Sequence, residues 1–271
     1  MSLTMRLRMQ GRAWGAIAAL APKHYLVYQA WVWLDLLVNI LAMIMFVFFW
    51  GAVYEAQDSL NGMSYAQTIN YILLARALSV IGGQSVIFSL GYAMREGLIG
   101  IELLRPIDYQ LNLYIGSLMN TFIGLLAALP LVGVGLLLGL SLPSDPLAWL
   151  AFIITLVLGR TVFFLFEWLV ACLTFYITEV WGLGVLFYAL GLFFGGQLLP
   201  LTLMPDWLQT LANALPFAQA LFVPASFLSG IHVPADLPAI LAGQLLWIAV
   251  LLVIGRWWFS VSVRQVTVQG G

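Results

Sequence analysis

The stretch "REGLIGIELLRPIDYQ", residues 95–110, lies between two long apolar runs at 70–93 and 111–140. It holds five charged side chains, two glycines and a proline, with large apolar residues among them. A simple connection between two apolar segments would be short and polar. Apolar residues flanked by charges indicate either a docking surface for another protein or a segment that lies flat on a lipid surface.

The composition of the whole chain indicates a membrane protein. Of its 271 residues, 63% are hydrophobic and only 8% are charged, whereas about 25% are charged in ordinary soluble domains. The net charge of −1 gives no basic field for nucleic acid, and the single cysteine, Cys172, excludes a disulfide within the chain. The apolar part of residues 1–24 is too short for a convincing signal peptide, so we expect insertion by the first span.

We expect one all-α integral membrane domain over residues 1–271, with six transmembrane helices. A spanning helix needs about 20 mostly apolar residues. Six stretches meet this requirement: roughly 31–53, 70–93, 111–140, 147–176, 180–200 and 237–259.

The positions of the basic residues predict the orientation of these spans. The loops at 54–69, 141–146 and 201–236 contain no lysine or arginine. Outside the spans, and for Arg256 at the inner end of span six, the basic residues all fall on the other side: Arg6, Arg8, Arg12, Lys23, Arg95, Arg105, Arg256 and Arg264. Because positive loops are retained in the cytoplasm, we expect both termini and the loop 94–110 to be cytoplasmic.

The N-terminal segment 1–29 precedes the first span and mixes basic with apolar residues. Arg6, Arg8 and Arg12 can reach lipid head groups while Trp14 and Ile17 enter the interface. This pattern predicts an interfacial helix on the cytoplasmic face. The alternative is a disordered basic tail that only sets the topology.

The extracytoplasmic segment 201–236 is long enough for a seventh span, but two features argue against one. Pro216 and Pro224 interrupt it, and a further crossing would move Arg256 and Arg264 to the outside. We therefore expect a re-entrant helical hairpin that dips into the membrane between spans five and six and returns. Such a backbone is tolerated only where protein or a water-filled cavity surrounds it.

The sequence contains no candidate catalytic site and no candidate metal site. His24 and His232 lie on opposite sides of the membrane in this topology. A nucleotide-binding P-loop requires a lysine after its last glycine, and the only lysine, Lys23, follows a proline. We therefore expect a protein that is not an enzyme and binds no cofactor of its own.

Four charged residues fall inside the predicted spans: Asp35, Arg76, Arg160 and Glu167. Such charges are costly in a membrane and tend to face cavities, partners or one another. Arg160 and Glu167, with Gln84 and Gln197, are candidates for a translocation path or a subunit interface. Structural pairing between helices is the alternative, and snorkelling also suits Asp35 and Arg76. Helix geometry puts Arg160 and Glu167 about 10 Å apart along the axis, too far for a direct bond.

Two motifs resemble those of type-2 ABC exporter permeases, in particular a bacterial six-span group. The first is the charged turn at 95–97 followed by "LLRP" at 103–106. The second is the segment 200–230, which contains "PDWL", "LPF" and a final "PASFLSG". Both motifs fall on the sides that the charge pattern predicts, and the layout matches over essentially the whole chain.

The resemblance implies a division of labour between parts of the chain. An N-terminal elbow helix precedes span one, a cytoplasmic coupling helix docks on an ATPase, and the re-entrant pair closes the outer end of the path. The residues that match the coupling region are Arg95, Glu96, Gly97, Ile101, Glu102, Leu104, Arg105 and Pro106. Those that match the re-entrant gate are Pro205, Trp207, Pro216, Phe217, Pro224 and Gly230.

The resemblance further implies a permease subunit of an ATP-driven exporter in a bacterial plasma (inner) membrane. ATP and Mg²⁺ would bind separate ATPase subunits, and a second permease, identical or homologous, would complete the path. The alternative is an ion-coupled secondary transporter that uses Asp35, Arg160 and Glu167 as a relay. The cargo stays open: lipid, drug and peptide all suit the aromatic-rich spans.

Overall fold

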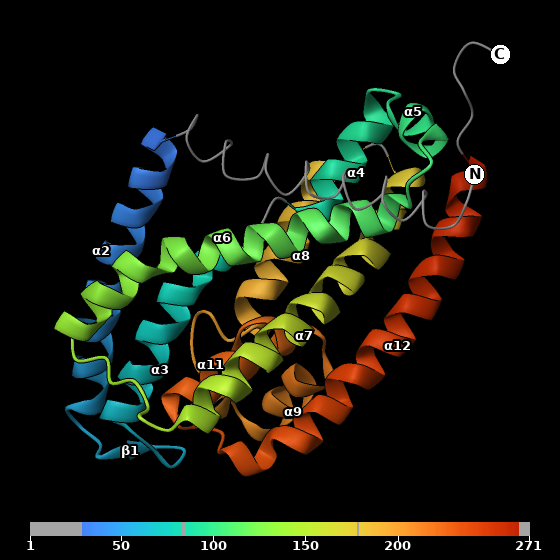
Figure 1. Ribbon diagram of the computed structural model, residues 1–271. Coiled ribbons are helices and arrows are strands. Elements are labelled where there is room, and N and C mark those ends of the chain that lie inside the picture. Colours follow the sequence, from blue (N-terminus) through green and yellow to red (C-terminus); the bar gives the residue numbers. More distant parts are fainter. Residues whose placement is uncertain (1–28, 83–84, 178, 266–271) are drawn as a thin grey trace.

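The computed structural model describes residues 29–82, 85–177 and 179–265 (Figure 1). The predicted N-terminal interfacial helix at 1–29 therefore lies almost entirely outside the described residues, as does Gln84. The described chain is nearly all α-helical. Its long helices are α2 (Gln29–Tyr54), α3 (Tyr65–Leu78), α4 (Val86–Arg95), α6 (Tyr109–Leu137), α7 (Pro146–Ala171), α8 (Val180–Phe194) and α12 (Leu237–Ser262).

Shorter elements join these helices. The α-helical ones are α5 (Ile99–Leu104), α9 (Asp206–Ala214), α10 (Phe217–Ala220) and α11 (Phe222–Ser229). The 3₁₀ turns are η1 (Ser79–Ile81), η2 (Cys172–Phe175), η3 (Leu201–Leu203), η4 (Pro234–Asp236) and η5 (Val263–Gln265). The strands β1 (Ser59–Leu60) and β2 (Met63–Ser64) form a small antiparallel hairpin. Its turn, Asn61–Gly62, has positive φ at both residues, as the favoured two-residue hairpin turn requires.

Within the described residues, five helical segments are long and apolar enough to cross a membrane. They are Trp33–Tyr54, Tyr65–Arg95, Tyr109–Leu137, Pro146–Phe175 and Pro234–Ser262. These five match predicted spans one to four and six. The fifth prediction, 180–200, corresponds to α8, which has only 15 residues. At 1.5 Å per residue this helix is about 22 Å long, less than the hydrocarbon thickness of a bilayer.

The sequence predicts an uninterrupted second span at 70–93, and the structure differs. The helix begins earlier, at Tyr65, where Ser64 and Gln67 form a reciprocal N-terminal cap. It then stops at Leu78, continues as η1 and restarts as α4 after an extended Gly82. Opposite this break, a Cβ at Gly124 of α6 would lie 2.7 Å from the Cα of Ile81. The missing side chain at Gly124 lets α6 pack directly on the broken backbone.

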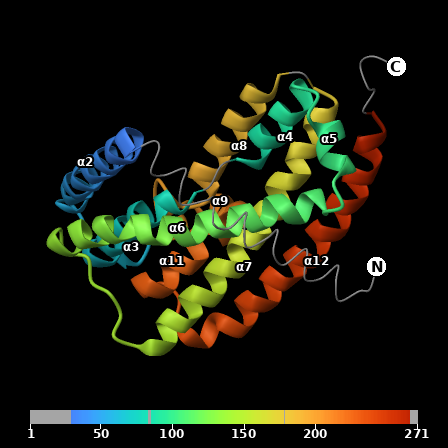
Figure 2. The same ribbon diagram turned by 45° about the horizontal axis from the view of Figure 1, so that its top comes forward.

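Two clusters of buried side chains form the core. One surrounds α3 and α11 and includes Tyr71 and Phe227. The other surrounds α4 and α7 and includes Ile87 and Trp168. Around these clusters α8 lies beside α4, and α12 lies along α7 (Figure 2). The described residues of α2 and α12 are mostly exposed and apolar, which suits helices that face lipid or another subunit.

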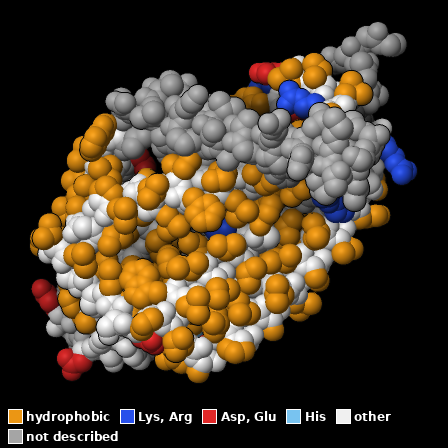
Figure 3. All heavy atoms as spheres, in the orientation of Figure 1, with side chains coloured by type: hydrophobic (Ala, Val, Ile, Leu, Met, Phe, Trp, Pro, Cys, Tyr) orange, Lys and Arg blue, Asp and Glu red, His pale blue; other side chains and the backbone are white. Residues whose placement is uncertain are grey.

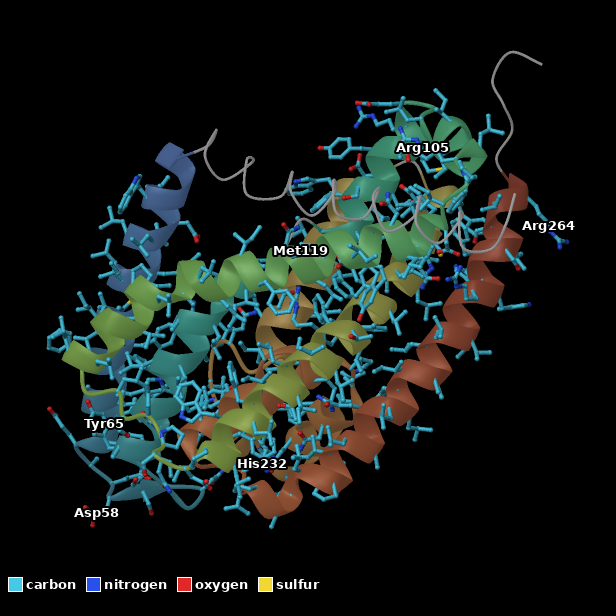
Figure 4. The ribbon with its side chains drawn as sticks, viewed as in Figure 1. Asp58, Tyr65, Arg105, Met119, His232 and Arg264 are labelled. Carbon is cyan, nitrogen blue, oxygen red and sulfur yellow. The ribbon has the colours of Figure 1, made fainter. Side chains whose placement is uncertain are left out.

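The bundle has two chemically different ends. Arg105 and Arg264 lie at one end, whereas Asp58 and His232 lie at the opposite end with the β-hairpin (Figure 4). Between these ends the visible face is predominantly hydrophobic, and acidic side chains gather near the hairpin (Figure 3). The separation of charge that the sequence predicts along the spans is therefore present in the folded chain.

Candidate functional site

The bundle encloses a cavity of about 580 Å³ between α2, α3, α4, α7, α8 and α10. Its polar lining contains all four charged residues that the sequence places inside spans: Asp35, Arg76, Arg160 and Glu167. The lining also includes Gln197. These residues come from segments far apart in the chain, so the fold itself creates this polar site. We call it the central cavity.

Glu167 connects the central cavity to the start of α4. Its Oε1 accepts a hydrogen bond from the Ser85 hydroxyl at 2.5 Å and another from the Val86 amide at 2.9 Å. Residue 85 immediately precedes α4, where the backbone amides of a helix lack partners. A carboxylate is stabilised at such a helix N-terminus, and Glu167 is itself buried.

Arg76 stabilises the end of α8. Its Nη2 donates to the Gln197 carbonyl at 2.9 Å, and its Cζ lies 4.7 Å from the ring centre of Phe46. The chain turns sharply here because Gly196 has a φ of +78°, and the Tyr71 hydroxyl donates to the Gly196 carbonyl. Arg76 therefore has a structural contact: its guanidinium donates to the Gln197 carbonyl in the turn that follows α8.

Arg160 has no such partner. Among the described residues it makes no hydrogen bond and no ion pair, and its Nε is buried without a partner. Its Cζ lies 5.2 Å from the ring centre of Phe163, a cation–π distance. No ion pair joins it to Glu167, in agreement with the spacing along the helix. Arg160 is therefore the cavity residue whose charge the described chain leaves least compensated.

Asp35 lies at the rim of the central cavity and is exposed. One turn further along α2, the Asn39 amide donates to the Asp35 carbonyl at 2.9 Å and accepts from the Ser79 hydroxyl at 3.1 Å. The sequence reasoning did not single out Asn39, Ser79 or Ser85. Each is a polar residue within an apolar run, and that signal would have identified them.

The segment 95–106 lies at the basic end of the bundle, where α5 presents an apolar surface (Figure 4). Leu98, Ile101 and Leu104 are 45%, 59% and 86% exposed, and we call these three residues the α5 surface. Arg95, Glu96, Arg105 and Pro106 are exposed around it. Gly97 makes the turn before α5 with a φ of +70°.

Two ion pairs hold this end of the chain. Within the segment, Glu102 and Arg105 pair at 3.0 Å, three residues apart. Just beyond it, Asp108 begins α6, accepts from the Leu111 amide and pairs with Arg256 of α12. Partial burial acts to raise the pKa of Asp108, but the hydrogen bonds from Arg256 and from the Leu111 amide outweigh it, and the pKa is lowered.

The segment 201–236 forms short helices that run into and along the bundle. Pro205 and Trp207 are exposed near the start of α9, whereas Pro216, Phe217 and Pro224 are buried. Within this segment, α11 ends at Gly230, which has a φ of +79°. The predicted gate residues therefore divide into an exposed pair, an inner group and a helix-ending glycine.

Phe217 is the one of these six residues that lines the central cavity. Its ring packs against those of Phe163, Phe166, Phe187 and Phe194. Next to it, α10 approaches α7 so closely that a Cβ at Gly159 would lie 1.9 Å from the Gln219 carbonyl oxygen. The inner part of the segment thus forms one wall of the cavity.

The apolar helices and the buried polar cavity define a multi-pass membrane protein, and the described residues bring together no group of three or more metal-ligating side chains. The model of the ABC-2 family transporter proteins matches residues 40–270, and the chain belongs to that family. It is a permease, the membrane subunit of an ABC transporter, and the family implies ATPase partner subunits. The resemblance drawn from the two motifs is confirmed. No curated protein and no solved structure matches the chain.

Proposed function

We propose that this chain is the permease subunit of an ATP-driven exporter, and that it docks on a separate ATPase through residues 95–106. The observation that carries the proposal is the α5 surface. Leu98, Ile101 and Leu104 are exposed at the basic end of the bundle and are ringed by charges. Exposed apolar residues inside a polar rim are typical of a docking surface.

The described contacts offer a route from the α5 surface to the central cavity. Helix α4 runs from Arg95, beside α5, back to Ser85 and Val86, both of which hydrogen-bond to Glu167. Its ten residues span about 15 Å. A rigid movement of α5 driven by ATPase closure would therefore pull on a buried carboxylate in the cavity wall. Such a displacement of packed elements is an established means of coupling distant sites.

The remaining parts of the proposal concern the topology and the assembly. The chain crosses the bacterial inner membrane six times, α8 providing the fifth crossing together with the turn that follows it. Both termini and residues 95–106 face the cytoplasm, residues 1–29 lie on the inner surface, and residues 201–236 re-enter from outside. A second permease, identical or homologous, completes the path. The exposed apolar residues of α2 and the basic end of the bundle support this arrangement.

A secondary transporter is the second candidate function, because the central cavity gathers Asp35, Arg160 and Glu167. Three intramembrane ionisable residues in one cavity are the feature expected of an ion relay. This candidate requires transport by the purified chain in liposomes without any ATPase. The exporter proposal predicts no transport under those conditions.

The test of docking is co-purification from the native membrane in mild detergent, through a tag on the C-terminal tail. The native chain is compared with the double variant Glu96→Arg with Arg105→Glu, and the control is Glu179→Gln with Arg264→Gln, two changes on the same predicted side of the membrane. Both variants keep the net charge and alter only exposed residues. We expect a P-loop ATPase with the native chain and the control, and its loss from the first variant. Equal retention by all three would contradict docking at residues 95–106.

A further inference from the structure

The central cavity contains an arginine whose surroundings are incomplete. Arg160 lies on α7 with its Nε buried and without a partner, and the described residues give its guanidinium neither a hydrogen bond nor an ion pair. Removing part of a cation from water without a compensating partner is strongly destabilising. Its contact with the Phe163 ring satisfies none of its N–H donors, so no contact among the described residues gives this guanidinium a structural role.

The other charges of the cavity are already engaged or lie apart. Glu167 uses its Oε1 at the start of α4, and Asp35 is exposed at the rim. Arg76, on α3, donates one hydrogen bond from its Nη2 to the Gln197 carbonyl. Its Nε is buried and has no partner among the described residues. Two arginines on different helices thus line one cavity, and each has an Nε donor without a partner among the described residues. An anion is the group that would satisfy both.

Much of the remaining lining is apolar and aromatic. Phe163, Phe187, Phe217 and Leu192 line the cavity beside the arginines. A purely hydrophilic anion would leave these apolar side chains in contact with water. A purely apolar ligand would remove water from Arg160 without giving it a hydrogen-bond partner. The volume of about 580 Å³ is that of a ligand site, large enough for a head group with the beginning of its hydrocarbon part.

The rim of the cavity supplies an exit for a longer hydrocarbon chain. Val38 of α2 and Trp181, Val185 and Tyr188 of α8 line the cavity and are 41–68% exposed. Helix α2 packs on α3 and α6, whereas α8 packs on α4 and α10, so the rim joins two separately anchored helices. A molecule with its head group at Arg160 can extend between them towards the apolar surroundings of the bundle.

We infer that the central cavity binds an amphipathic molecule with an anionic head group, held by Arg160 and Arg76, and with its hydrocarbon part against the phenylalanines. This inference rests on the proposed function only in taking that molecule as the cargo. Binding itself requires neither an ATPase nor a second permease. It is therefore tested on the full-length chain alone.

The experiment measures binding of a fluorescently tailed phosphatidylglycerol to the purified full-length chain in a neutral detergent. Three competitors are compared: unlabelled phosphatidylglycerol, a neutral diacylglycerol and inorganic phosphate. We expect only the first to displace the probe at equal concentration. Displacement by inorganic phosphate alone, or by diacylglycerol as effectively, would overturn the inference of an amphipathic anion.

The variants assign the binding to particular residues. We expect Arg160→Gln to weaken binding at least about thirtyfold, because it removes a buried charge-assisted contact. Arg160→Lys keeps the charge and restores most of the binding, and Arg264→Gln, an exposed arginine outside the cavity, leaves it unchanged. Unchanged binding in Arg160→Gln would overturn the assignment. So would a loss in Asp35→Asn alone, because that result indicates a cationic ligand.

Thermal stability separates a binding role from a structural one. Without lipid, Arg160→Gln should unfold at the same temperature as the native chain or higher, since it removes a charge for which the described residues provide no hydrogen-bond or ion-pair partner. Phosphatidylglycerol should raise the unfolding temperature of the native chain but not that of the variant. A variant that unfolds much earlier without lipid would show that Arg160 is structural. A native chain that retains the ATPase but does not bind the lipid would refute this inference alone. A native chain that binds the lipid but retains no ATPase would refute the docking proposal alone.

Discussion

Helices α5 and α11 are both short and apolar, but their environments are opposite. All eight residues of α11 are buried between α3 and α7, whereas Ile99 is the only buried residue of α5. Helix α11 has the sequence "FVPASFLS" and α5 has "IGIELL". The apolar residues of α11 therefore stabilise the bundle, and those of α5 are available for another molecule. Burial, rather than composition, distinguishes a structural helix from a docking helix.

The largest effect is expected inside α11. Phe227 is 1% exposed and belongs to the core cluster around α3. Phe227→Ala would leave a cavity there and cost about 3–5 kcal/mol of unfolding free energy. Thermal unfolding of the purified chain measures this loss. An unfolding temperature as high as that of the native chain would contradict the burial of α11.

A smaller loss is expected where the same segment contacts α7. A methyl group at Gly159 would collide with the Gln219 carbonyl, so Gly159→Ala should push α10 away at a cost of about 1–3 kcal/mol. Gly133→Ala is the matched control, because no atom lies within 4 Å of a Cβ at Gly133. The control should be neutral or slightly stabilising, since alanine favours a helix. Equal unfolding temperatures for the two variants would show that α10 does not lie tightly against α7.

At α5 the expected effect is on binding. Leu104 is 86% exposed, so Leu104→Ala should change the unfolding free energy by less than about 0.5 kcal/mol. We expect it to weaken ATPase binding about tenfold, as the loss of a central interface residue does. Leu137→Ala is the control, because Leu137 is 88% exposed on α6. The measurement is the affinity of each variant for the ATPase. An equal loss of affinity in both variants would contradict a specific role of α5 in ATPase binding.

The smallest effect concerns the ion pair that anchors the end of the chain next to α5. The pKa of Asp108 is lowered in the folded chain, so its stabilising contribution is present above the ordinary carboxyl pKa of about 4 and is lost as the pH falls through the lowered value. The pair is partly exposed, so its contribution is below about 1 kcal/mol. Asp108→Asn should unfold slightly earlier than the native chain at pH 7, and the difference should shrink as the pH falls below about 4. A difference that grows on acidification would contradict this sign.

Much of the fold follows from local sequence. Hydropathy and the distribution of arginines predict five of the long helical segments and the separation of charge between the two ends, because both depend on residues within one segment. Gly97 and Pro106 likewise mark the limits of α5, since they act on their own backbone. The amino-acid sequence alone therefore predicts the class of membrane protein.

The break after Leu78 and the short length of α8 were not predictable in the same way. Both depend on contacts across the bundle, such as Gly124 against Ile81 and Arg76 against the Gln197 carbonyl. The cavity partners were also hidden, because Ser85 meets Glu167 from 82 positions away in the chain. The sequence identified the charged residues inside the spans, but it could not predict which groups would form hydrogen bonds with them.

The most direct test of the docking claim is site-specific photocrosslinking in the native membrane. A photoreactive amino acid is placed at Leu104 in one variant and at Trp207 in another. Both positions are exposed, at 86% and 70%, but Leu104 belongs to the α5 surface whereas Trp207 belongs to α9. We predict a crosslink to a P-loop ATPase from position 104 and none from position 207. A crosslink to the ATPase from 207 but not from 104 would contradict the proposed coupling surface.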